Sequence, residues 1–277
     1  MCSSTGYVFK TVFLVFILSI SNAQAELILS APPRESLKAG NELYGPLAEH
    51  LTQLLGEKVI YKHPDNWLHY QRELRNDVYD VVFDGPHFVS WRIKHLKHSV
   101  LVKLPGTLEF FIVTKKSDDK ITELKDLIGK KICGISPPNL ATMTVIDQFK
   151  NPVRQPDILP VRGGFKQVYK EFSSGSCDAA VFRNNYYNKK LTADNRAMTR
   201  TLYESTPLPN QAISVSTRIN ANNRDKIVQS LTHGEGQNIA RTIVKRFGGK
   251  KVKSFIPASQ QEYLQQAELL EGVVFGW

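Results

Sequence analysis

Two successive series of alternating strand and helix patterns run through this chain, and each series ends at a proline-containing break. In the first series, Leu43, Leu47, Leu51 and Leu54 repeat at helical spacing, and Gly56 ends that helix. The strands expected in this series are Leu27–Ser30, Val59–Tyr61, Val81–Phe83 and Val100–Lys103. Its other expected helices are one that Asp65 or Asn66 caps and that runs to Arg75, and one whose first turn holds Pro86. This alternation predicts a parallel sheet covered by helices.

The second series begins after the break at Leu104–Thr107. Its expected strands are Glu109–Thr114, Lys131–Ile135, Asp157–Val161 and Asp178–Phe182, and its expected helices are Leu124–Leu127, Leu140–Phe149, Phe165–Ser173 and Asn184–Lys190. After the second break, Ser205–Asn210, the pattern predicts a strand at Ala212–Ser216 and helices near Asn223–Thr232, Gly236–Phe247 and Ser259–Leu270. We therefore predict an α/β fold of two lobes that the chain crosses twice, with lobe 1 at residues 26–106 and 209–277 and lobe 2 at residues 107–208.

The first 25 residues carry the pattern of an export signal. Lys10 supplies the positive charge, Thr11–Ile20 is the apolar stretch, and Ala23–Ala25 is a small-x-small cleavage site. The apolar stretch is shorter than the roughly 20 residues that span a bilayer, although a retained anchor is the alternative. We expect a mature protein of about 250 residues that begins near Glu26, outside the cytoplasm.

The mature chain is basic. Without Lys10 it holds 35 Lys and Arg against 26 Asp and Glu, a net charge of +9. Such a charge suits a small anionic ligand, and a solvated basic surface without a ligand is the alternative. We expect no nucleic-acid partner, because the basic residues are scattered and the chain is exported.

Two cysteines remain in the mature chain, and exported cysteines are usually paired. Cys133 lies in one short apolar strand and Cys177 opens another, so a disulfide forms if these strands are parallel neighbours. Two buried free thiols are the alternative, and neither cysteine follows a loop that would expose it for catalysis.

No catalytic motif is present: the chain has no GxSxG elbow, no phosphate-binding loop and no HExxH. Three loops instead follow predicted strands and open helices, at residues 30–35, 84–88 and 136–142. The free N–H groups at helix N-termini favour anions, and loops at one sheet edge would face a common cleft. Ordinary capped connections are the alternative for each loop. We expect no catalytic residue, no cofactor and no metal.

Several segments resemble the substrate-binding proteins of phosphate, phosphite and phosphonate ABC transporters. The resemblance spans nearly the whole mature chain and is carried by Tyr44–Ala48, Tyr79–Pro86, Leu124–Lys131, Pro207–Asn210 and Glu262–Tyr263. It implies a bilobal periplasmic-binding-protein fold of type II, with a two-segment hinge and a ligand between the lobes.

We expect the ligand to be a small phosphorus oxyanion or organophosphonate. The residues expected to line its site are Arg34, Glu35, Trp67, Tyr70, Asp84, Gly85, His87, Phe88, Ser136, Asn139, Thr142, Arg183 and Asn210. Arg34 and Arg183 would attract the anion. Glu35 and Asp84 would repel a dianion unless they meet an amine on the same ligand. If His87 contacts the anion, affinity should rise as pH falls from about 7.5 to 5.5, where an ordinary histidine gains charge. For Trp67 and Tyr70, core packing is the alternative.

The resemblance implies a periplasmic receptor that delivers its ligand to an ABC transporter permease, and we expect the mature protein to be a monomer. The alternative is a ligand-binding module that reports to a membrane sensor, because both functions use the same lobe closure.

Overall fold

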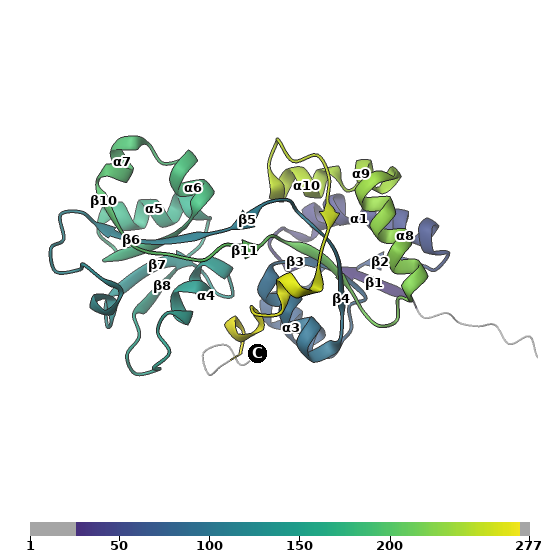
Figure 1. Ribbon diagram of the computed structural model, residues 1–277, viewed down its shortest axis with the longest axis horizontal. Coiled ribbons are helices and arrows are strands. Elements are labelled where there is room, and N and C mark those ends of the chain that lie inside the picture. Colours follow the sequence, from purple (N-terminus) through teal and green to yellow (C-terminus); the bar gives the residue numbers. More distant parts are fainter. Residues whose placement is uncertain (1–25, 272–277) are drawn as a thin grey trace, which may run out of the picture.

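The computed structural model describes residues 26–271, so the predicted export signal lies outside the described residues. Two α/β lobes lie side by side along the long axis of the molecule, and two thin strands connect them (Figure 1). This bilobal arrangement confirms the predicted fold class. Among residues 26–271, no helix is both long and apolar enough to cross a membrane.

Lobe 1 is built on a six-stranded sheet with the order β13-β4-β12-β3-β1-β2. Its strands are β1 (Leu27–Ser30), β2 (Val59–Tyr61), β3 (Val81–Asp84), β4 (Ser99–Lys103), β12 (Ala212–Val215) and β13 (Ile256–Pro257). β1 pairs in parallel with β2 and β3, but β12 runs antiparallel between β3 and β4. The expectation of a wholly parallel sheet is therefore wrong. β12 enters directly from the hinge at the carboxyl ends of β3 and β4, so it must run in the opposite direction.

Helices cover both faces of this sheet. They are α1 (Leu37–Leu55), α2 (Trp67–Arg75), α3 (Pro86–Leu96), α8 (Ala221–His233), α9 (Glu235–Ile239) and α10 (Arg241–Gly248). α1 begins earlier than the apolar repeat indicated, because the Ser36 hydroxyl accepts the Ala39 N–H at 3.3 Å and caps the first turn. The helix expected at Gly236–Phe247 is divided into α9 and α10 at Ala240.

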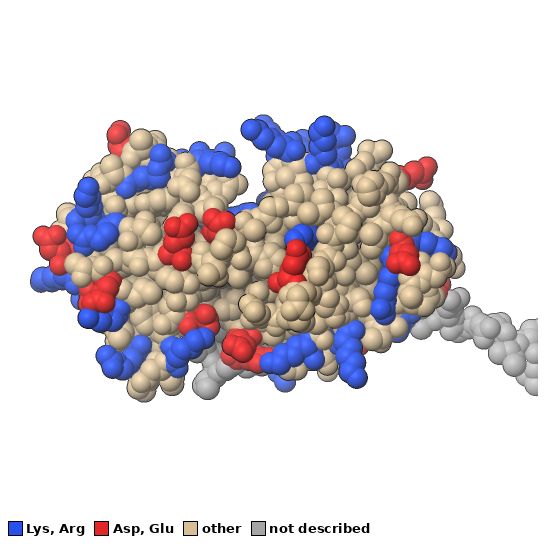
Figure 2. Space-filling view, in the orientation of Figure 1, with Lys and Arg blue, Asp and Glu red and all other residues tan. Residues whose placement is uncertain are grey.

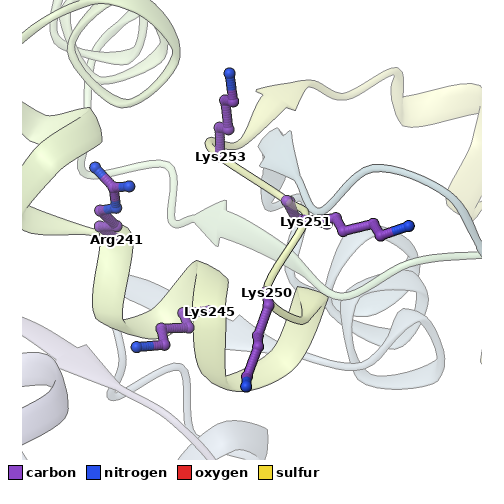
Figure 3. A pocket seen from close by; sticks show the side chains of 6 residues that line it. Arg241, Lys245, Lys250, Lys251 and Lys253 are labelled. Carbon is purple, nitrogen blue, oxygen red and sulfur yellow. The ribbon is translucent and has the colours of Figure 1, made fainter.

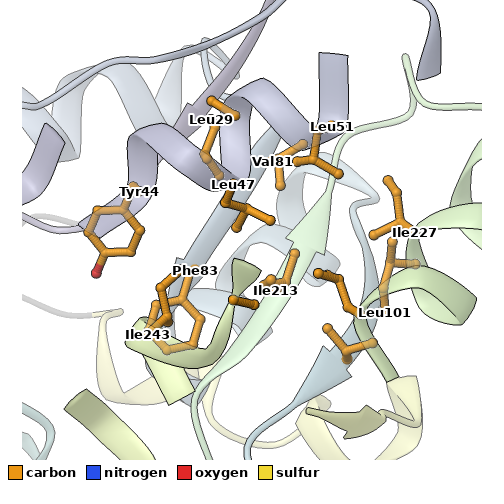
Figure 4. Close-up of a cluster of buried hydrophobic side chains, with 14 of the residues drawn as sticks. Leu29, Tyr44, Leu47, Leu51, Val81, Phe83, Leu101, Ile213, Ile227 and Ile243 are labelled. Carbon is orange, nitrogen blue, oxygen red and sulfur yellow. The ribbon is translucent and has the colours of Figure 1, made fainter. Parts of the chain in front are cut away.

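The core of lobe 1 lies between the sheet and the layer formed by α1, α8 and α10 (Figure 4). Leu47 and Leu51 of α1 meet Val81 and Phe83 of β3 there, and all four are fully buried. The leucine spacing that predicted the helix is thus the spacing that fills this core.

Lobe 2 holds a five-stranded sheet with the order β10-β6-β9-β7-β8. Its strands are β6 (Phe110–Lys115), β7 (Lys131–Ile135), β8 (Asp157–Val161), β9 (Ala179–Arg183) and β10 (Thr199–Glu204). Its helices are the 3₁₀ turn η1 (Leu124–Leu127), α4 (Leu140–Asp147), α5 (Phe165–Ser174), α6 (Asn184–Lys189) and α7 (Ala193–Ala197). β7 pairs in parallel with β8 and β9, whereas β6 and β10 are antiparallel additions.

Cys133 of β7 and Cys177, just before β9, form a disulfide with a Cα–Cα distance of 5.7 Å. The prediction of this pairing is confirmed, and its premise of parallel neighbouring strands also holds.

The hinge consists of β5 (Thr107–Leu108) and β11 (Leu208–Pro209), which pair antiparallel with each other. Asn210 fixes its lobe 1 end, where its side-chain amide donates to the Pro105 carbonyl oxygen at 2.9 Å. Both connections lie at the predicted breaks. The lobe boundaries at residues 106–107 and 208–209 stay a prediction.

The C-terminal segment returns across lobe 1. The helix expected at Ser259–Leu270 is wrong: the structure has two 3₁₀ turns, η2 (Gln260–Tyr263) and η3 (Ala267–Leu269). Two side chains anchor this C-terminal segment to the rest of the protein. The Tyr263 hydroxyl donates to the Asn210 carbonyl oxygen at 2.6 Å, and Leu270 is buried in a cluster that includes Phe88 of lobe 1 and Met143 of lobe 2.

Candidate functional site

The loops after β3 and β7 face each other across the boundary between the lobes. Gly85 is the N-cap of α3, whose first turn holds Pro86 and His87, and residues 136–139 lead into α4. Nε2 of His87 lies 3.0 Å from the carbonyl oxygen of Pro138. This contact confirms the expectation that the two loops meet at the carboxyl edges of their sheets.

On the elements that approach the boundary between the lobes, several buried side-chain atoms have no hydrogen-bond partner among the described residues. Buried polar groups are nearly always satisfied, so such atoms point to water or another bound group. In the loop after β1, on α1, in the first turn of α3 and at the end of β9, these atoms are Arg34 Nη1, both carboxylate oxygens of Glu35, the Tyr44 hydroxyl, His87 Nδ1 and Arg183 Nε. Ser90, His98, Gln211 and Gln266 each carry one further atom without a partner among residues 26–271.

Arg34 and Glu35 follow β1 and lie beside the end of α10. The guanidinium groups of Arg34 and Arg246 lie 5.6 Å and 5.1 Å from the ring centroid of Phe247. Glu35 Oε1 lies 3.2 Å from Arg246 Nη2, an ion pair that lacks hydrogen-bond geometry, and its side chain is 10% exposed. Arg34 therefore keeps a free N–H group, and Glu35 keeps free acceptors.

Tyr44 projects from the buried face of α1 and is 1% exposed. Burial raises the pKa of Tyr44 above its usual value, with a further rise from Glu35 and an opposing effect from Arg34. The residue therefore stays a neutral phenol, which offers one O–H donor.

His87 is neutral in this environment. Burial lowers the pKa of His87 to about 4, although the carbonyl of Pro138 and the carboxylate of Asp84 oppose the shift. The ligand-free ring therefore stays neutral between pH 7.5 and 5.5, and the rise of affinity expected over this range stays a prediction. Since Nε2 faces a carbonyl oxygen, we assign the hydrogen to Nε2, which leaves Nδ1 as an acceptor.

Arg183 ends β9 and lies at the edge of lobe 2 that faces lobe 1. Its backbone pairs with Phe110 at the start of β6, next to the hinge. Burial lowers the pKa of the Arg183 guanidinium, and no carboxylate among the described residues pairs with it. A desolvated cation of this kind gains stability when an anion binds.

The hydroxyls and amides expected in the lobe 2 loop are mostly engaged within the protein. Asn139 Oδ1 accepts the Ala141 N–H at 3.0 Å and so caps α4, and the Thr142 hydroxyl donates to the Ile135 carbonyl oxygen at 2.6 Å. Ser136 is half-buried at the same loop. These contacts shape the loop, and a ligand contact of Asn139, Thr142 or Ser136 stays a prediction.

Four of the predicted residues are engaged in the packing of lobe 1: Tyr70, Asp84 and Phe88 are buried, and Trp67 is half-buried. Both oxygens of Asp84 accept from Arg92, at 2.9 Å and 2.8 Å, and the Tyr70 hydroxyl also donates to Asp84. Trp67 stacks on Phe88 with ring centroids 6.1 Å apart, and Phe88 is 1% exposed. These contacts correspond to the core-packing alternative for Trp67 and Tyr70.

Sequence reasoning missed Tyr44 and Arg92. Tyr44 stands beside Leu43 in the apolar repeat of α1, a position that carries no signal of a ligand contact. Arg92 stands between Trp91 and Ile93, and a charged residue inside an apolar run was the available sign of a buried ion pair.

The fold and this interlobe site define a bilobal periplasmic binding protein. A family model described as "ABC transporter, phosphonate, periplasmic substrate-binding protein" matches residues 29–263, and the chain belongs to this family. No curated protein matches it in sequence.

Several solved structures share the fold at low sequence identity. XAC2383 from Xanthomonas citri bound to ATP is 12% identical, with a TM-score of 0.68 over 88% of this chain and 95% of that one. PhnD1 from Prochlorococcus marinus in complex with methylphosphonate is 15% identical, with a TM-score of 0.62 over 88% and 97%. A binding protein of an ABC phosphonate transporter from Pseudomonas aeruginosa is 11% identical, with a TM-score of 0.57 over 89% and 85%.

Proposed function

We propose that this protein is the periplasmic receptor of an ABC uptake transporter and binds a small phosphorus oxyanion or organophosphonate between its lobes. One observation carries the proposal: each lobe supplies an arginine, Arg34 or Arg183, with a buried N–H that has no partner among the described residues. Guanidinium groups match the geometry of phosphorus oxyanions. A ligand held by both arginines would join the lobes.

The remaining free atoms of the site favour a ligand that also carries a hydrogen-bond donor. Tyr44 donates, but Glu35 and the Nδ1 atom of His87 accept. A dianion would leave these acceptors unsatisfied and would meet the Glu35 charge. A phosphonate with an ammonium group satisfies both the free donors and the free acceptors of the site. We therefore propose an aminoalkylphosphonate as the favoured member of the ligand class.

The related structures agree with this class of ligand. Methylphosphonate and ATP, the ligands named for PhnD1 and XAC2383, both carry phosphorus–oxygen anions.

Calorimetry with a matched ligand pair tests the proposal. Methylphosphonate and aminomethylphosphonate differ only in the amine. We expect both to bind, with aminomethylphosphonate tighter by about tenfold, the effect of one charge-assisted hydrogen bond. Glu35→Gln should remove this preference and leave methylphosphonate affinity equal or higher. If wild type binds neither these ligands nor phosphate, the assignment is wrong.

We further propose that the receptor is a monomer that acts without catalysis after loss of residues 1–25. Its exposed large apolar side chains, such as Leu68, Val153 and Met198, are scattered over different elements, which supports a monomer. Mass spectrometry of the exported protein should find Glu26 as its first residue.

A further inference from the structure

A positively charged pocket lies on lobe 1, outside the interlobe site. It has a volume of about 580 Å³ and is lined by Arg241, Lys245, Lys250, Lys251, Val252 and Lys253. We call Arg241 and the four lysines the basic rim. All five are exposed, and none forms an ion pair or side-chain hydrogen bond within residues 26–271. Their charge is therefore available to a partner from solution.

The nitrogen atoms of the basic rim do not converge. In Figure 3, the amines of Lys245, Lys250 and Lys251 point in different directions, and the Lys253 amine points away from all three. Such an arrangement produces an extended positive field but does not enclose an ion. It suits brief attraction of an anion better than tight binding.

The basic rim lies beside the opening between the lobes. Figure 2 shows Lys and Arg side chains gathered over α10 and the loop after it, next to the hollow that separates the lobes. Further basic side chains are visible on the opposite side of this hollow, over lobe 2. An anion that approaches the opening therefore meets positive charge on both sides.

α10 also connects the rim to the interior. Arg241 and Lys245 belong to the rim, and the next residue, Arg246, lies 3.2 Å from Glu35 of the candidate site. Arg246 and Arg34 both lie over the ring of Phe247, at 5.1 Å and 5.6 Å from its centroid. Positive groups thus follow one another from the exposed rim through Arg246 to the partly buried Arg34.

We infer that the basic rim is an encounter site, which captures the anionic ligand from solution and passes it along Arg246 to the interlobe site. The inference rests on the proposed function, because it assumes an anionic ligand. Charge of one sign around a cleft raises the local concentration of oppositely charged ligands and speeds association by 10-fold or more. The rim should therefore act on the association rate, whereas the interlobe contacts set the dissociation rate.

Stopped-flow tryptophan fluorescence with methylphosphonate tests this inference. The rim variant carries Lys250→Glu, Lys251→Glu and Lys253→Glu, three changes in an exposed loop. At an ionic strength of about 0.01 M, where charges act over roughly 30 Å, its association rate constant should fall about tenfold. Its dissociation rate constant should stay within twofold of wild type. At about 1 M salt, where the range falls to roughly 3 Å, the two proteins should associate equally fast.

The control variant carries Lys116→Glu, Lys120→Glu and Lys130→Glu, which change the net charge by the same amount. These exposed lysines follow β6 or precede β7, at the edge of lobe 2 opposite Arg183. The control should lose less than threefold in association rate. Equal losses in the two variants would show an effect of net charge alone and overturn the encounter site.

Other outcomes separate this inference from the receptor assignment. If methylphosphonate binds in calorimetry but the rim variant associates at the wild-type rate, only the encounter site is wrong. An increased dissociation rate would instead place the rim in the ligand site itself. Unchanged ligand kinetics with lost ligand uptake in cells would assign the rim to docking on an acidic protein. No binding of methylphosphonate or phosphate by wild type would reject both proposals.

Discussion

Nε2 of His87 in lobe 1 lies 3.0 Å from the carbonyl oxygen of Pro138 in lobe 2, and this contact joins the two loops that face the candidate site. Because the ring is buried and uses Nε2 for the contact, its Nδ1 atom remains an acceptor without a partner among residues 26–271. We propose that this one side chain serves both the lobe contact and the choice of ligand.

Burial of the His87 ring makes the stability of the protein depend on pH. The pKa of His87 is lowered to about 4 by burial, below the value of about 6.5 in an unfolded chain, so the unfolded state binds more protons. The resulting stability is present above pH 6.5 and is lost as pH falls toward 4, by about 1.4 kcal/mol per pH unit from this group. Urea unfolding at several pH values between 6.5 and 4.5 measures how the free energy of unfolding changes with pH. This change should be smaller in His87→Gln than in wild type, and the control His233→Gln, at an exposed histidine, should behave as wild type does. The same pH dependence in all three proteins would contradict a lowered pKa of His87.

Arg183→Gln should weaken methylphosphonate binding at least tenfold, because it removes a buried cation and its N–H donors from the lobe 2 side of the site. Hydrogen bonds to charged groups contribute about 1.5–3 kcal/mol each. The matched control is Arg162→Gln, since Arg162 is exposed on the same lobe. Calorimetry that finds the same affinity for both variants would remove Arg183 from the site.

Asp84→Ala should destabilise the protein by about 3–5 kcal/mol, because it leaves the guanidinium of Arg92 buried without its carboxylate. Arg92 is 1% exposed, and its remaining partners are Ser214 and Tyr70. The control is Asp147→Ala, which breaks a pair with the exposed Lys150 and should cost about 1 kcal/mol or less. Equal losses in denaturant unfolding would mean that Asp84 is not a structural residue of lobe 1.

Cys133→Ala with Cys177→Ala should lower the stability of the protein by roughly 4 kcal/mol, the chain-entropy value for a loop with a sequence separation of 44. The denatured, unreduced wild type should contain no free thiol among these two cysteines. Detection of two free thiols in the mature protein would contradict the disulfide.

The periodic elements could be predicted from the sequence because their residues fill the core. Leu47 and Leu51 identified α1, and the apolar runs at β3 and β7 identified the strands that precede the two facing loops. The direction of β12 could not be predicted in this way. Its four residues are buried whichever way the strand runs, and its orientation depends on where the chain leaves the hinge.

The candidate site could be predicted only in part. Arg34, Glu35, His87 and Arg183 stand out as polar residues at strand ends, and the structure leaves an atom of each without a partner in the described part of the chain. Asp84 carries the same sequence signal, yet Arg92, eight residues further along α3, occupies its carboxylate. Which polar residues are satisfied internally depends on packing between distant segments, and the order of residues does not contain that information.

The position of β12 in the centre of the lobe 1 sheet affects how the chain folds after export. β12 lies between β3 and β4, yet all of lobe 2 separates it from them in sequence. As the chain emerges from its amino end, β3 and β4 have no strand between them until the segment that follows β11 arrives. Lobe 2 is continuous, holds its own disulfide and can fold during this interval. The unpaired edges of β3 and β4 are then a temporary template for other strands, so the wait for residues 212–215 is the period in which aggregation competes with folding.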